Sequence, residues 1–182
     1  MTLGNDPADP LRGSDERFRR GRAELAEGLR ALLGPRAAAE PLDDPGRAAA
    51  LAAEAVATQR DARRHPWAVV RAEWEDGERG AAAELLHAVS AYAGPRPAWL
   101  VVPGRDPQAV PVGSDAVLDN PLGFAALAGG ELVLLDQELP AGVSLAGPAA
   151  GAARWRLEVW GAEPWLSAAT RALREQRQRR AR

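Results

Sequence analysis

The stretch Trp155–Trp160, WRLEVW, is the clearest alternating pattern in the chain. Its residues fall on the two sides of an extended strand, with Trp155, Leu157 and Val159 on one side and Arg156, Glu158 and Trp160 on the other. A period of two residues is typical of a strand with one buried face. The sequence therefore predicts a half-buried β-strand here.

A second stretch with this pattern begins after Pro66, where helical spacing gives way to a period of two. Its predicted core face holds Ala68, Val70, Ala72 and Trp74, and its other face holds Trp67, Val69, Arg71 and Glu73. Shorter apolar runs predict further strands at 99–102, 110–112, 132–135 and 143–145, the third of them central. Helical spacing predicts helices at 78–93, 120–127 (capped by Asn120) and 164–178.

Two helices are predicted before this body. The first starts at Ser14 as N-cap and ends at Gly34, and the second starts with the cap Asp44 and Pro45. The expected organisation is a disordered tail at 1–13, a helical arm of two helices at 14–64, a globular domain at 65–178 and a basic tail at 179–182.

The order of these elements predicts an α+β fold: an N-terminal helical arm and a mixed, mostly antiparallel sheet covered by helices. Helices 78–93 and 164–178 are expected to cover one face of that sheet. The alternative is an α/β fold, because the strand, helix and strand between 67 and 102 also suit a parallel crossover.

Composition removes several kinds of chemistry. All 23 basic residues are Arg, and Lys and Cys are absent, so lysine Schiff bases, thiol nucleophiles and cysteine metal clusters are unavailable. Such a lysine-free composition is typical of a bacterial-type genome rich in G and C. Trp is frequent, at six residues against three Phe and Tyr together.

The formal net charge of −2 supplies no general attraction to nucleic acid or to an anionic membrane. With neither an apolar span nor a signal-peptide pattern, the expectation is a soluble cytoplasmic protein. The arginine group from Arg171 to Arg182 is interpreted as a solvated helix end, with a phosphate-binding patch or an acidic protein partner as alternatives.

Candidate catalytic groups are sparse. His65 lies in a linker, and His87 has only Glu84 and Ser90 as polar helical neighbours. No Ser has the frame of a nucleophile elbow, no glycine-rich phosphate loop follows a strand, and Asp115 with Asp119 are expected to cap and solvate a loop. We therefore expect no catalytic residue, no metal and no cofactor.

The strongest candidate site is a patch that occurs on both alternating strands. If the two strands share a sheet, their polar faces combine into one surface of Trp, Arg and Glu, made of Trp67, Arg71, Glu73, Arg156, Glu158 and Trp160. Trp and Arg are enriched at interface hot spots. The simpler interpretation is cross-strand ion pairs under a covering helix, with the indoles packing beside them.

These observations favour a non-catalytic protein-interaction module, such as an adaptor, a regulator or a neutralising partner, with a protein partner bound at this patch. Homo-oligomer formation is left open. The alternative is a small-ligand-binding protein or small enzyme with a pocket between sheet and helices, lined by Trp99, Trp155 and Trp165, with Glu158 or His87 as acid or base.

Overall fold

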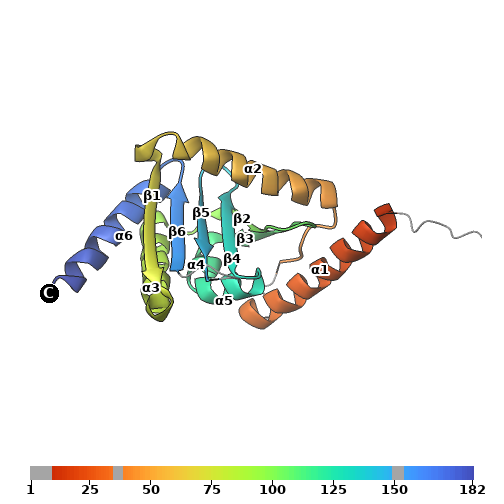
Figure 1. Ribbon diagram of the computed structural model, residues 1–182, viewed down its shortest axis with the longest axis horizontal. Helices are drawn as coiled ribbons and strands as arrows, with labels where there is room; N and C mark the ends of the chain where they lie inside the picture. Colours follow the sequence, from red (N-terminus) through yellow and green to blue (C-terminus); the bar gives the residue numbers. More distant parts are fainter. Residues whose placement is uncertain (1–9, 35–38, 149–153) are drawn as a thin grey trace, which may run out of the picture.

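The computed structural model describes residues 10–34, 39–148 and 154–182, and it is built on one antiparallel sheet. The sheet has six strands in the order β1-β6-β5-β4-β2-β3 (Figure 1). Their bounds are β1 Val69–Glu75, β2 Pro97–Val102, β3 Gln108–Gly113, β4 Glu131–Asp136, β5 Gly142–Ala146 and β6 Arg154–Trp160. The α+β class predicted from the sequence is confirmed.

The strand pairing corrects two details of that prediction. A mixed, mostly antiparallel sheet was expected, but every pairing between these strands is antiparallel. The α/β alternative is wrong, because β1 and β2 are separated in the sheet by β6, β5 and β4 and form no parallel unit. Helix α3 (Arg79–Ala93) instead carries the chain from the edge strand β1 across the sheet to β2.

One face of the sheet is covered by α3, α4 (Ser114–Leu118), α5 (Pro121–Leu127) and α6 (Trp165–Arg180). The main core lies between this layer and the sheet, and its members include Trp74, Leu86, Leu134, Val159 and Trp165. The prediction that helices 78–93 and 164–178 cover one face is confirmed. The caps predicted at Asp44 and Asn120 are also present, each accepting hydrogen bonds from the first turn of its helix.

The opposite face is crossed by α2 (Pro45–Arg63), which runs along the top of the sheet in Figure 1. A second buried cluster lies beneath it and includes Leu51, Ala55, Leu135 and Trp160. Helix α1 (Pro10–Leu33) lies at the β3 side of the sheet, where Phe18 joins this second cluster while Leu25 and Leu29 join the main core. The two helices expected as an arm therefore both pack on the sheet.

Two local predictions need correction. The first helix begins at Pro10, so Ser14 is not its N-cap; its hydroxyl instead donates to Asp106 Oδ1 at 3.1 Å. Ala68 is not on the core face of β1. Pro66 opens a 3-10 turn over Pro66–Ala68, so Trp67 and Ala68 belong to this turn and the strand starts at Val69. Residues 1–9 of the expected tail lie outside the described residues.

Candidate functional site

The two alternating strands found in the sequence are neighbours at one edge of the sheet. In the register of β1 and β6, Arg71 lies opposite Glu158 and Glu73 lies opposite Arg156. These four side chains come from alternate positions of their strands, so they share the face that α2 crosses. The structure thus brings the polar faces of the two strands together.

Glu158 is the centre of this arrangement. Its carboxylate accepts hydrogen bonds from Arg71 Nε at 2.7 Å, from Arg63 Nη2 at 2.6 Å and from Gln59 Nε2 at 2.7 Å. Burial opposes ionisation of Glu158, but the two arginines outweigh it and hold the pKa of this carboxyl below its usual range. Glu158 is therefore a charged structural link between β6, β1 and α2, with its proton-accepting oxygens already engaged.

The outer half of the patch is a looser group of surface charges. Arg156 Nε lies 3.6 Å from Glu73 Oε1, and Arg154 lies 2.8 Å from Glu75 and 3.7 Å from Glu73. Each of these side chains is between about half and two-thirds exposed. Exposed pairs of this kind contribute about 0.2–1 kcal/mol each, so they leave the groups free to exchange partners.

The two tryptophans of the patch have opposite environments. Trp67 is 79% exposed, beside His65 at a ring distance of 5.1 Å. Trp160 is 0% exposed beneath α2, and its Nε1 donates to Thr58 Oγ1 at 3.3 Å. Trp160 is therefore a packing residue in this fold, whereas Trp67 lies on the surface at the start of β1.

The four residues of the alternative pocket do not come together. Trp99 belongs to the cluster under α2 and lies below the guanidinium of Arg47, 5.7 Å from its ring centre. Trp155 and Trp165 belong to the opposite face of the sheet. His87 is exposed on α3, where its Nδ1 lies 3.0 Å from Asp119 Oδ1.

A buried carboxylate that the sequence reasoning missed lies at the end of β4. Asp136 Oδ2 accepts hydrogen bonds from Arg96 Nε and from Trp165 Nε1, the latter at 2.7 Å, and Oδ1 accepts from the backbone N–H groups of Glu138 and Leu139. Burial raises the pKa of Asp136, but these donors outweigh it and keep the pKa below its usual range. With both oxygens saturated, Asp136 fixes the start of α6 against the sheet.

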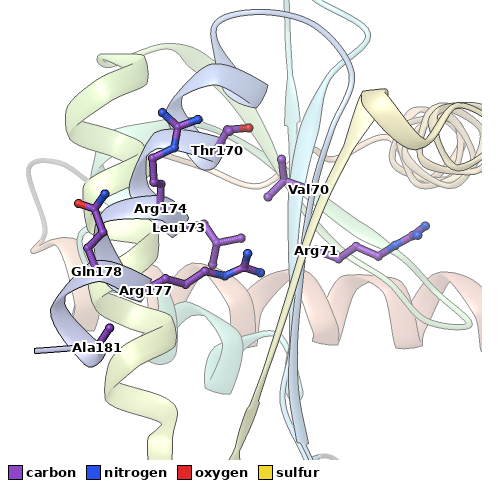
Figure 2. A pocket seen from close by; sticks show the side chains of 8 residues that line it. All are labelled: Val70, Arg71, Thr170, Leu173, Arg174, Arg177, Gln178 and Ala181. Carbon is purple, nitrogen blue, oxygen red and sulfur yellow. The ribbon is translucent and has the colours of Figure 1, made fainter.

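The outer side of β1 faces a groove of about 600 Å³. Its walls are Val70 and Arg71 on β1 and a set of residues on α6 and at its C-cap: Thr170, Leu173, Arg174, Arg177, Gln178 and Ala181. Figure 2 shows Arg177 reaching toward β1, while Arg71 points away to the other face of the strand. The groove thus combines an apolar floor, an edge strand and two cationic side chains.

A second depression, of about 460 Å³, lies between α2 and the sheet. Its lining is mainly apolar and includes Val56, Val101, Val133 and Trp160, with Arg60 and Glu131 among its polar members. The Ala-rich face of α2 leaves this space because its short side chains fill little of the gap above the sheet.

No protein-family model, no curated protein and no solved structure matches the chain. Within the described residues, no helix has the length and apolar character needed to cross a membrane. The same part of the chain contains no group of three or more His, Asp or Glu side chains arranged to hold a metal ion.

Proposed function

We propose that the chain is a non-catalytic protein-interaction module, of the adaptor, regulatory or neutralising type, that binds a protein partner at the β1 side of the sheet in the cytoplasm. The contact surface consists of the exposed members of the patch: Trp67, Arg71, Glu73 and Arg156. Trp160 and Glu158 support this surface from beneath. Nucleic acid is not the proposed partner, because the net charge of −2 supplies no general attraction to it.

The observation that carries the proposal is the exposure of Trp67. An indole that is 79% exposed keeps a large apolar surface in water, and together with Val56 it is one of the two large apolar side chains that stand out on the described surface. It lies in the 3-10 turn that leads into β1, an edge strand whose Arg71 and Glu73 side chains are about half exposed. Trp and Arg are among the residue types most enriched at interface hot spots.

The proposal is tested by recovering the tagged full-length chain from its own cells after mild cross-linking. The wild type and Val56→Ala should recover the same stoichiometric protein companion, and Trp67→Ala should lose it. Val56 is the matched control because it is also a large exposed apolar residue, at 64%. We expect Trp67→Ala to weaken the purified complex roughly thirtyfold, the scale of a hot-spot residue.

Thermal unfolding keeps this experiment interpretable. Because Trp67 contributes little to the core, Trp67→Ala should melt within a degree or two of the wild type. Failure to recover any companion, or recovery that is equal for Trp67→Ala and the wild type, would contradict the proposal. So would turnover of a small molecule that depends on a single acidic group or histidine.

A second candidate function rests on the apolar depression under α2. Its volume of about 460 Å³ suits a small ligand, and Arg60 beside apolar walls suits an apolar carboxylic acid. Titration calorimetry with dodecanoate tests it, with Val133→Phe as the variant that fills the depression. Heat of binding that is the same in both proteins, or absent from both, would remove this candidate.

A further inference from the structure

The edge strand β1 presents unpaired backbone groups along its outer side. Gly161 N donates to Ala68 O at 3.1 Å, so the backbone of Ala68 faces β6. Because these directions alternate along an antiparallel strand, the N–H and C=O groups of Val69, Arg71, Glu73 and Glu75 face outward. No other strand of the described chain lies beyond β1, so this side is a template for strand addition.

Helix α6 extends over the place that an added strand would occupy. In Figure 1 its C-terminal half runs past β1, beyond the edge of the sheet. The groove residues on α6 and its C-cap recur at intervals of three and four from Thr170 to Ala181, which defines one continuous face of the helix. At 1.5 Å per residue this face is about 16 Å long, which is the length of about five residues of strand.

The charges on this face are arranged for an acidic occupant. Elsewhere on α6, Arg171 and Arg179 pair with Glu175, and Arg180 pairs with Glu78. Arg174 and Arg177, the two arginines in the groove, form no ion pair with any carboxylate among the residues that the structure describes. An incoming strand that carried Asp or Glu on its α6 side would supply the missing carboxylates.

We propose that an extended acidic segment of a partner protein binds as an additional strand at the outer side of β1, beneath α6. Backbone hydrogen bonds to β1 hold the segment, and Arg174 and Arg177 pair with the carboxylates on its α6 side, whose methylene groups contact Val70 and Leu173. This inference rests on the proposed function, because it states the chemistry of the partner that a protein-interaction module would take at this edge.

A second copy of the chain is a less suitable occupant. Pairing two β1 strands about a twofold axis perpendicular to the sheet would place both α6 helices on the same face, each extending over the other copy's edge strand. That arrangement brings Arg174 and Arg177 of the two copies together, and like charges at an interface oppose association. An acidic strand without its own covering helix avoids both problems.

The test uses the full chain and a dye-labelled peptide of seven residues, the length of β1, in which Glu alternates with Val. Fluorescence anisotropy should detect saturable binding that weakens as salt is added. Binding should be lost when Lys replaces Glu in the peptide, and also when alternate peptide nitrogens are methylated, because methylation removes the donors that a strand needs.

Matched variants of the chain locate the site. We expect Arg174→Ala and Arg177→Ala each to lower the affinity for the peptide by up to about fivefold. The single variant Arg179→Ala removes the same charge from the same helix outside the groove and should bind like the wild type. Glu75→Pro should also block binding and still fold, because the φ of Glu75 is −65°, the value that proline requires.

Some outcomes would overturn the inference. These are equal binding of the Glu and Lys peptides, equal affinity of the Arg174→Ala and Arg179→Ala proteins, no binding of the Glu peptide, or a dimer that Glu75→Pro dissociates. None of these results bears on whether a protein companion is recovered in a way that depends on Trp67, so the proposed function is tested separately. Suppose that Trp67→Ala loses the companion while the wild type fails to bind the Glu peptide. That result would support the proposed interaction module and rule out the acidic strand at β1.

Discussion

Arg71 and Glu158 lie directly opposite each other on β1 and β6, and the guanidinium of Arg71 donates to the carboxylate at 2.7 Å. Arg63 of α2 donates to the same carboxylate from the next layer. One partly buried acidic side chain therefore connects the edge strand, its neighbour and the helix above them. The outer surface that we propose for partner binding is built on this connection.

Replacing this carboxylate with an amide should lower stability without changing the fold. Glu158→Gln keeps the size of the side chain but removes the charge that Arg63 and Arg71 share. Hydrogen bonds to charged groups are the stronger ones, so we expect a loss of about 1–2 kcal/mol, which lowers Tm by about 2–8 °C. Glu131→Gln is the control, since Glu131 lies exposed at the start of β4; a Tm equal to that of this control would contradict the structural role.

Trp160 should behave as a core residue. Its side chain is fully buried beneath α2, so Trp160→Ala leaves a large cavity and should cost about 3–5 kcal/mol of unfolding free energy. Trp160→Phe fills most of the space and loses only the hydrogen bond to Thr58, so it should cost roughly 1 kcal/mol. Denaturant unfolding measures both. If Trp160→Ala unfolded like the wild type, the interpretation of Trp160 as a packing residue would be wrong.

The fold was predictable where local signals were strong. The alternation at 155–160 and the caps Asp44 and Asn120 each specify one element within a few residues, because they depend on the backbone conformation of that element. Helix α4 was missed, since the five residues Ser114–Leu118 are too few to display a helical period and follow a glycine. The strand order was not predictable, because it depends on packing between segments far apart in the chain.

The site was predictable only in part for the same reason. That β1 and β6 both carry Arg and Glu on one face is visible in the sequence, but their register, and the burial of Trp160 under α2, depend on tertiary packing. Asp136 gave no local signal, since it only ends an apolar run and its partners Arg96 and Trp165 lie far along the chain.

Asp136 should be among the most sensitive positions in the chain. Asp136→Asn places an NH₂ group where only donors converge and removes the charge opposite Arg96, so we expect a loss of about 3–5 kcal/mol. Glu138→Gln is the control, because Glu138 also contacts Arg96 but its side chain is 63% exposed, and its loss should be below about 1 kcal/mol. Equal losses for the two variants, measured by urea unfolding, would refute the assignment.

Gly142 should not accept a side chain. A Cβ atom there would lie 2.4 Å from the backbone oxygen of Leu134 and 2.6 Å from the Trp160 ring, so Gly142→Ala should destabilise by about 1–3 kcal/mol. Gly80→Ala is the matched control, since a Cβ on this residue of α3 meets nothing within 4 Å and should stabilise the helix by about 0.5–1 kcal/mol. If thermal unfolding gave Gly142→Ala a higher Tm than Gly80→Ala, the close packing of β5 would be contradicted.

Acid should destabilise the protein through two carboxylates, the buried Asp136 and the partly buried Glu158. The pKa values of Asp136 and Glu158 are lowered by folding from ordinary values of 3.8 and 4.5, so the folded state binds fewer protons than the unfolded state. Their contribution to stability is therefore complete above about pH 5 and is lost as the pH falls through the lower pKa values of the folded protein.

The variants separate this contribution from general acid unfolding. Because Glu158→Gln and Asp136→Asn have no carboxyl to protonate at these positions, their Tm values should fall less steeply below about pH 5 than that of the wild type. Glu131→Gln should follow the wild-type slope, since that carboxylate lies exposed at the start of β4. Calorimetric scans between neutral and acidic pH measure these slopes, and parallel curves for all four proteins would show that neither carboxylate is held ionised by its arginine partners.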